Sequence, residues 1–496
     1  MIRKFLMISA ASLAIAGCGN NGNGDGGGPS LSLGQKSSQE QLAGALNASP
    51  KHGLTTDLFF KGDTAAAGEG DLRSAVLNYA SALANGKVDP TKIRDVYTIP
   101  RPKVEVEAGL DQALSENKLA EWLDSLAPQT AEYKALSNAF VQLVESSPDL
   151  AGASIPATGD VIKQGGTDPR VPAVAQNLRA QGYLAAQPQA GGAEQGQQND
   201  QAQQGQQAPQ AQPTNVFTPE LSKALAQWQA DSGLKPDGVV GPNTVEALNG
   251  GPKDRARKLA VAMERLRWLE REPPATRIDV NTAATMLTYF RDGQPRNQRR
   301  VVVGEPGWET PQLGSPMYQL VANPTWTVPK SIAEDEISKK SNSWLQQNNF
   351  IRKDGYWVQQ PGPDNALGEV KFDMKNDEAI YLHDTPAKAL FSQDERHRSH
   401  GCVRVQNALQ FARMLAQDDG VLDKFNKAMA TGDQTFVDLN AEIPVRLVYH
   451  TAFLGDNGRV QYAQDAYGWD NDVATALGYE ARRVARVQHR AGDVGP

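Results

Sequence analysis

Residues 379–405 read AIYLHDTPAKALFSQDERHRSHGCVRV, and this stretch decides the fold. The apolar run 379–382 predicts a strand that ends at His383. Cys402 follows 19 residues after His383, a gap long enough for a loop to return the chain beside that strand. Tyr381 lies two positions before His383, so on a strand both side chains point to the same face. The stretch therefore predicts a β-sheet that brings a histidine close to a cysteine.

Runs with the period of two that is typical of strands continue on both sides of this stretch. The pair Asp292-Gly293 marks a hairpin turn. We expect further strands at 276–280, 286–290, 299–303, 318–322, 369–372 and 445–449. Residues 273–475 should therefore form a mainly β catalytic domain.

A polar segment, 330–366, interrupts these strands and carries scattered aromatic residues. An insertion of this length between strands is more often functional than decorative. We interpret it as a capping insertion that forms a lid over the site, with a plain surface excursion as the alternative.

The chain before the strands is helical, so the expected fold class is multidomain α+β. Residues 46–185 should form a helical scaffold, with helices near 71–84, 110–126 and 131–144. Residues 186–213 should be a disordered linker, because 187–213 hold 12 Gln and no apolar type except Ala. A connecting helix at 251–272 and a basic C-terminal tail at 476–496, which we expect to be solvated, complete the organisation.

Residues 214–250 contain a compact unit, FTPELSKALAQWQADSGLKPDGVVGPNTVEALN at 217–249. Thr218 can cap a helix that has Pro219 at its first position, and a second helix should begin near Asn243. The string GLKPDGVVGPNTVEAL resembles the small helical peptidoglycan-binding module of cell-wall enzymes. A helical packing unit that binds nothing is the alternative.

The N-terminus reads as an export signal, 1–18. Arg3 and Lys4 precede an uncharged stretch, 5–17, that would span about 20 Å as a helix. A bilayer core is roughly 30 Å thick, so a signal segment fits better than a membrane span. The sequence LAIAGC at 13–18 resembles the bacterial lipoprotein cleavage box, which implies lipidation of Cys18 and a flexible tether at 19–45. An ordinary signal with an incidental cysteine is the alternative.

Export and lipidation predict a periplasmic protein of a Gram-negative-type bacterium. Gly19 does not resemble the aspartate signal for inner-membrane retention, so we expect anchoring to the outer membrane rather than the inner one. The net charge of -7 gives no electrostatic footprint for nucleic acid.

With Cys18 lipidated, Cys402 has no disulfide partner in the chain, which holds two cysteines. Nucleophilic catalysis needs a thiolate, a base and donors for an oxyanion. Here His383 could be the base, Tyr381 could assist, and the amides of Gly401 and Cys402 could form the oxyanion hole. Four alternatives are a zinc site with His397 and His400, an intermolecular disulfide, a serine triad for which no elbow motif appears, and a buried structural cysteine.

The segment HDTPAKALFSQDERHRSHGCVRVQNA, 383–408, closely resembles the active-site signature of the L,D-transpeptidases. GEPGWETPQLGSPMYQLVANPTWTVP, 304–329, is also similar to that family, in the branch with a scaffold, a peptidoglycan-binding module and a capping insertion. The resemblance implies that Cys402 attacks the carbonyl of the third residue of a peptidoglycan stem, releases D-alanine and forms a thioester. It implies that His383 is the base.

The same resemblance implies that His400 and Gly401 shape the substrate pocket. Arg404 could favour the thiolate or hold a substrate carboxylate, with a structural salt bridge as the alternative. Ser399 should orient the loop, while Trp308 and Trp326 could line the substrate groove or pack in the core.

The acceptor in this family is usually the side-chain amine of diaminopimelate, which gives a 3-3 crosslink. No metal or organic cofactor is implied, and acylation by carbapenems is expected. The partners are then peptidoglycan, a membrane, and cell-wall synthesis enzymes or carboxypeptidases that could dock on the scaffold. Three other functions stay open: a carboxypeptidase or endopeptidase with water as acceptor, attachment of a lipoprotein to the wall, and a non-catalytic wall-binding anchor.

Overall fold

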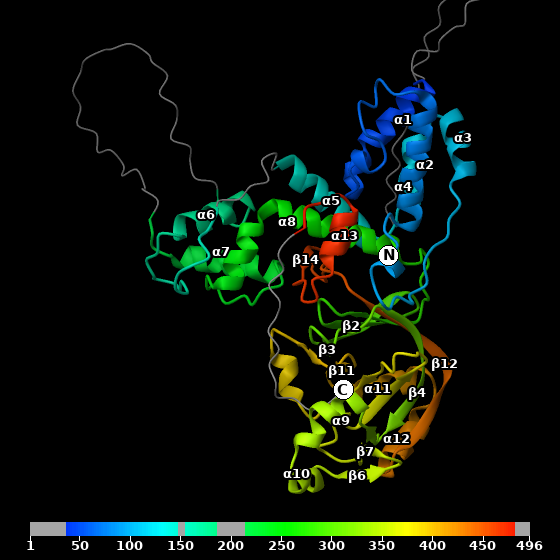
Figure 1. Ribbon diagram of the computed structural model, residues 1–496, viewed down its shortest axis with the longest axis vertical. Coiled ribbons are helices and arrows are strands. Elements are labelled where there is room, and N and C mark those ends of the chain that lie inside the picture. Colours follow the sequence, from blue (N-terminus) through cyan, green and yellow to red (C-terminus); the bar gives the residue numbers. More distant parts are fainter. Residues whose placement is uncertain (1–35, 147–153, 186–213, 482–496) are drawn as a thin grey trace, which may run out of the picture.

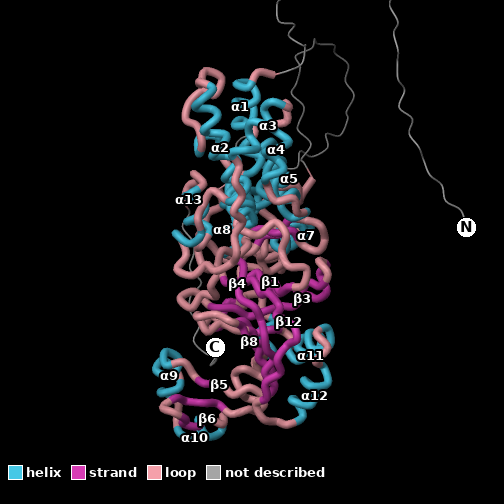
Figure 2. Tube along the Cα trace, turned by 90° about the vertical axis from the view of Figure 1, so that its right-hand side faces the viewer, coloured by secondary structure: helices cyan, strands magenta, loops and turns pink. Residues whose placement is uncertain are grey.

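The computed structural model describes residues 36–146, 154–185 and 214–481. Helices fill one end of the molecule and the large sheet fills the other, with a small subdomain beyond the sheet (Figures 1 and 2). The predicted lipidation at Cys18, most of the tether, the glutamine-rich linker and most of the basic tail lie outside the described residues. Within the described ranges, no helix is both long enough and apolar enough to cross a membrane.

The helical end is built from α1 (Ser38–Asn47), α2 (Glu69–Asn85), α3 (Glu107–Ser115), α4 (Leu119–Leu126) and α5 (Ala131–Ser146). Three short 3₁₀ turns connect them: η1 (Ser49–His52), η2 (Thr56–Leu58) and η3 (Pro90–Lys92). These helices share one apolar core with the second half of α8 (Pro242–Arg267). The predicted helix over 110–126 is two helices, because Asn117 adopts the left-handed conformation with φ 56° and breaks the run. Asparagine tolerates this conformation better than most residues.

The peptidoglycan-binding-like unit has a different extent from the one the sequence predicted. Helix α6 (Val171–Ala180) packs with α7 (Pro219–Asp231) and the first half of α8 in a core of their own. Two further pairings, Ile162 with Val240 and Thr167 with Val216, tie the two sides of the glutamine-rich segment together. The predicted scaffold boundary at 185 therefore does not follow the packing, since 155–184 belong with 217–248.

Capping and turn residues in the sequence correctly predicted where two helices of this unit begin. Thr218 Oγ1 accepts from Leu221 N–H at 3.2 Å and caps α7, as predicted. Helix α8 begins at Pro242 and is bent at Gly251, whose φ of 56° is non-helical. The bend separates the module helix from the connecting helix, which continues into the scaffold core.

The catalytic sheet has nine strands in the order β10-β3-β11-β9-β8-β4-β12-β1-β2, and β3 also pairs with β2. This extra pairing closes eight of the strands into a ring, and the short strand β10 stays outside it, paired with β3. The strands are β1 (Arg277–Asn281), β2 (Met286–Arg291), β3 (Gln294–Gly304), β4 (Leu313–Ala322), β8 (Val370–Met374), β9 (Leu382–His383), β10 (His397–Ser399), β11 (Val403–Val405) and β12 (Thr435–Val448).

Two features of the sheet agree with the sequence. Asp292 and Gly293 both have positive φ, at 53° and 75°, and connect β2 to β3 as the predicted hairpin. Helices α11 (Ala408–Asp418) and α12 (Leu422–Ala430) bury their apolar faces in the core of the sheet. The mainly β catalytic domain and the α+β class are confirmed.

The insertion forms a subdomain with its own small core. It contains α9 (Lys330–Asp335), η4 (Ile337–Lys339), α10 (Asn342–Gln347), β6 (Phe350–Lys353) and β7 (Tyr356–Gln359), and β7 also pairs with β5 (Trp326–Thr327). Trp326 is buried in this core, so of its two predicted roles the structure shows packing.

After β12, the chain returns to the helical part of the molecule. Strands β13 (Ala452–Leu454) and β14 (Val460–Tyr462) form a hairpin, and α13 (Asp470–Ala476) packs on α8 (Figure 1). Asp470 and Arg265 form a buried ion pair at 2.5 Å. The segment after β12 thus fastens the sheet to the scaffold.

Candidate active site

The register of two short strands assembles the site. Strands β9 and β11 are parallel neighbours in which Arg404 lies opposite His383. The Val403 N–H donates to the Tyr381 carbonyl at 3.1 Å, and these residues come one position before Arg404 and two before His383. Residues that alternate along paired strands share a face. The structure therefore places Tyr381, His383, Cys402 and Arg404 on one face at the end of β11.

Cys402 is held as a buried thiol. It is 5% exposed, and burial raises its pKa to about 11. Two kinds of interaction lower the pKa of Cys402, but by less than burial raises it. They are hydrogen bonds with the backbone and side chain of Tyr381, and the positive charges of Lys371 and Arg404. Cys402 Sγ also lies 3.8 Å from the Ala379 carbonyl oxygen. At neutral pH the Cys402 thiol is protonated, so a base would be required to make it a nucleophile.

His383 is fully buried on β9, the strand that pairs with β11 just after Cys402. Its ring meets the Tyr381 ring edge-on, with centroids 5.7 Å apart. Burial raises the pKa of the Tyr381 hydroxyl well above its ordinary value, so this hydroxyl stays protonated. The pair thus offers a titratable ring and a neutral hydroxyl on the face of the nucleophile.

Lys371 is a site residue that the sequence did not reveal. It lies on β8 directly opposite His383, its ammonium is 4.3 Å from the centroid of the Tyr381 ring, and it pairs with Asp373 at 2.6 Å. Its charge lowers the pKa of Cys402. The strand at 369–372 was predicted, but which of its side chains faces His383 depends on register.

The loop before the nucleophile is braced by Ser399. Ser399 Oγ donates to the Cys402 carbonyl at 2.5 Å and accepts from the Gly401 N–H at 3.2 Å. Gly401 has φ 111°, and its carbonyl accepts from Thr310 Oγ1 at 2.7 Å. The Gly401 amide, one of the two predicted oxyanion donors, is therefore already hydrogen-bonded to Ser399. Of the two, the Cys402 amide remains as the predicted donor.

His400 links the active-site loop to the capping insertion. Its Nε2 lies 3.1 Å from Glu336 Oε1, and its ring meets Trp308 edge-on at 5.0 Å. Glu336 belongs to the predicted lid segment, so the insertion contacts the loop that carries the nucleophile.

His397, which the zinc alternative would use as a ligand, contacts other groups in the structure. It is buried on β10, with Nδ1 2.6 Å from Glu395 Oε1 and Nε2 3.0 Å from the Thr282 carbonyl oxygen. Both ring nitrogens are thus engaged away from Cys402, which removes His397 from the zinc alternative.

Comparisons with known proteins found matches in three parts of the chain. Residues 275–434 match the family model of the L,D-transpeptidase catalytic domain, 32–140 match a scaffold domain, and 167–248 match a "Putative peptidoglycan binding domain". The last match spans the glutamine-rich segment, in line with the packing of α6 on α7.

A protein of Haemophilus influenzae named "Putative L,D-transpeptidase" is 31% identical over 243 residues. The match covers 44% of this chain and 49% of the relative, so the chain spans about half the length of that protein.

Two solved structures are also similar. An L,D-transpeptidase from Mycobacterium smegmatis is 15% identical, with 35% of this chain and 58% of that chain covered and a TM-score of 0.21. An L,D-transpeptidase from Stackebrandtia nassauensis is 13% identical, with 60% and 97% covered and a TM-score of 0.23. Scores this low add nothing to the match of the family models.

The sheet and its buried thiol define a cysteine site on a closed mainly β domain. By the matched family models, this domain is similar to the L,D-transpeptidase catalytic domain, and the chain also holds regions similar to a scaffold domain and a peptidoglycan-binding domain.

Proposed function

We propose that this protein is an L,D-transpeptidase that uses Cys402 as its nucleophile and His383 as its base. The observation that supports the proposal is the register of β9 and β11, which puts both side chains on one face, with Tyr381 two positions before His383 on that face. The substrate class is the peptidoglycan stem peptide, in keeping with the two matched domains.

The first half-reaction forms a thioester. His383 takes the proton of the Cys402 thiol, and Sγ attacks the carbonyl carbon of the third stem residue. The C–S bond forms, the C–N bond to the terminal D-alanine breaks, and the imidazolium returns its proton to the departing amine. We assign the Cys402 amide as a donor to the oxyanion, and removing one such donor typically costs about a hundredfold or more in rate.

The second half-reaction transfers the acyl group to an amine of a neighbouring stem. The new C–N bond forms as the C–S bond breaks, His383 takes the proton of the attacking amine, and the thiolate is reprotonated. A 3-3 crosslink results when the amine belongs to the third residue of the acceptor stem. The raised pKa of Cys402 supports this cycle, because a poorly acidic thiol requires a base in every turnover.

The remaining domains take roles around this chemistry. The unit formed by 155–184 and 217–248 binds the wall and raises the local concentration of stems. The capping insertion covers bound substrate through the Glu336–His400 contact. Lipidation of Cys18 anchors the protein to the outer membrane on its periplasmic side, and the scaffold docks wall-synthesis or carboxypeptidase partners.

Intact mass spectrometry of the purified chain tests the mechanism. We would incubate wild type, Cys402→Ala and His383→Ala with a disaccharide tetrapeptide, and separately with a carbapenem. We expect a stoichiometric adduct and a crosslinked dimer with wild type, no adduct with Cys402→Ala, and acylation slowed about 10²- to 10⁴-fold with His383→Ala.

Each other outcome revises the proposal. Tripeptide product without a dimer would make the enzyme a carboxypeptidase. An adduct that persists in Cys402→Ala would move the nucleophile elsewhere. No adduct in a folded wild-type protein would leave a wall-binding anchor.

A further inference from the structure

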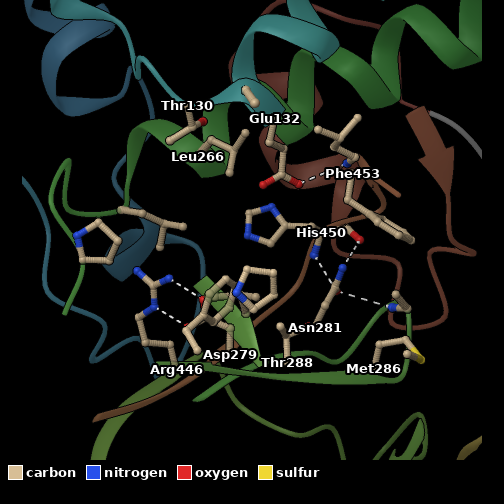
Figure 3. Close-up of a pocket in the computed structure, with 18 of the residues that line it drawn as sticks. Thr130, Glu132, Leu266, Asp279, Asn281, Met286, Thr288, Arg446, His450 and Phe453 are labelled. Carbon is tan, nitrogen blue, oxygen red and sulfur yellow. Dashed lines mark hydrogen bonds and ion pairs between the residues drawn. The ribbon is translucent and has the colours of Figure 1, made fainter. Parts of the chain in front are cut away.

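A cavity of about 620 Å³ lies between the helical end and the sheet, away from Cys402. The start of α5 and the second half of α8 form its roof, strands β1, β2 and β12 form its floor, and β13 closes one side (Figure 3). None of the residues placed in the active site above lines it. The cavity is large enough for a drug-sized ligand.

Most of its wall is apolar. Leu266, Met286, Phe290 and Phe453 contribute side chains from three elements, α8, β2 and β13. Burying the apolar part of a ligand against this wall is favourable by roughly 25 cal/mol per Å² of apolar surface removed from water. Orientation and specificity must then come from the few polar groups that reach the cavity.

His450 supplies one of these groups. It is 6% exposed, and its Nδ1 makes no hydrogen bond with any residue in the described part of the chain. The backbone of His450 is fixed on both sides by Asn281, whose Oδ1 accepts its N–H and whose Nδ2 donates to its carbonyl, each at 3.0 Å. Burial lowers the pKa of His450 to about 3, so the ring is neutral and carries an acceptor nitrogen.

Glu132 supplies the second group. Figure 3 shows its carboxylate and the His450 ring pointing toward one another inside the cavity. One of its oxygens accepts from the Leu454 N–H at 3.3 Å, and burial raises its pKa. A carboxylate in such a place favours a positively charged partner.

The nearby arginines do not provide that partner. Arg446 donates twice to Asp279, at 2.7 Å each, and Arg277 donates to the same carboxylate at 2.9 Å. Both guanidiniums are paired with Asp279 on the floor of the cavity. An anionic ligand would be repelled, because it would have to lie between the Asp279 and Glu132 carboxylates. The charge distribution therefore favours a cation at the Glu132 wall.

We propose that this cavity binds a small molecule with a primary ammonium group on an apolar body. The ammonium donates to the Glu132 carboxylate and to the acceptor nitrogen of His450, while the body packs on Met286 and Phe453. Because its roof belongs to the scaffold and its floor to the catalytic sheet, an occupant bridges the two. This site is independent of the transpeptidase chemistry proposed for Cys402.

Methyl NMR of the full chain with labelled methionine tests the site. Met286 lines the cavity, and Met317, in the core of the sheet, serves as the internal reference. We would titrate with phenethylamine and, as the uncharged analogue, 2-phenylethanol. We expect a saturable shift of the Met286 methyl with the amine, a steady Met317 signal, and at least about tenfold weaker binding of the alcohol.

Two variants sharpen the result. Glu132→Gln should weaken amine binding roughly tenfold or more, whereas Glu270→Gln, on the exposed rim of the same cavity, should change it less than twofold. Retained binding in Cys402→Ala separates this site from the catalytic one. The proposal is overturned if Met286 shows no saturable shift, if the alcohol binds as well as the amine, or if a folded Glu132→Gln protein binds unchanged.

Discussion

The protonation state of Cys402 gives the sharpest prediction. Its pKa of about 11 lies two units above the ordinary thiol value of 9.0. At pH 7.5 an ordinary thiol is about 3% ionised, and Cys402 is about 0.03% ionised, a hundredfold difference in thiolate. The more basic thiolate is intrinsically about tenfold more nucleophilic, since reactivity rises by roughly 0.4 to 0.5 log units per pKa unit. The resting thiol should thus alkylate about tenfold more slowly than an ordinary cysteine.

The assay is alkylation by iodoacetamide between pH 6 and pH 11, with peptide mapping to read position 402 alone. The logarithm of the rate should rise with unit slope to near pH 11. Limited access to a buried thiol lowers all rates together and leaves this slope unchanged. Tyr381→Phe should move the inflection still higher, because the hydroxyl lowers the Cys402 pKa. Tyr318→Phe, a tyrosine on β4, is the matched control.

A plateau at or below pH 8 would refute the reasoning. It would mean that a thiolate–imidazolium pair with His383 already exists in the resting enzyme, so that activation precedes substrate binding. An unshifted profile in Tyr381→Phe would show that the hydroxyl does not act on the thiol.

Three further predictions concern the surroundings of the active site and His450 in the second cavity. Ser399→Ala removes the brace on the Cys402 carbonyl and should lower the free energy of unfolding by about 1–3 kcal/mol in urea titrations; an unchanged midpoint and slope would contradict this. Glu336→Gln weakens the contact with His400, so hydrogen exchange in 330–366 should become faster while the catalytic sheet stays protected. Equal exchange in both proteins would show that this contact does not hold the insertion in place. His450 has a folded pKa of about 3 against an ordinary 6.5, so its contribution to stability is present above pH 6.5 and is lost as the pH falls toward 3. Between pH 6.5 and pH 5 the loss should be about 2 kcal/mol, and His450→Gln should flatten that slope in pH-dependent unfolding.

Much of the local structure was predictable from the sequence. The Asp292-Gly293 hairpin, the Thr218 cap and most of the core strands follow from residue types within a few positions of one another. The stretch from Tyr381 to Cys402 likewise predicted that a histidine and a cysteine would meet, because strand period and loop length limit where the chain can return.

Features that depend on distant contacts could not be predicted in this way. Helix α6 joins α7 across the glutamine-rich segment because their apolar faces complete one core, and nothing within either helix specifies its partner. His397 looked like a loop residue, yet pairing of β10 with β3 buries it against Thr282, 115 positions earlier in the chain. Short strands such as β10 and β11 carry too little pattern to be recognised alone.

The sequence by itself determined which groups are available for the proposed chemistry: a single thiol outside the predicted signal segment, a histidine at the end of a strand, and the glycine and serine beside Cys402. The tertiary structure decided their states and neighbours. It buried Cys402 and so raised its pKa, placed Lys371 opposite His383, turned the Gly401 amide toward Ser399, and set Glu132 against His450 in a cavity between two domains. The physical reason is that residue type and backbone preference are local properties, whereas register, burial and electric field arise from segments that meet only after the chain has folded.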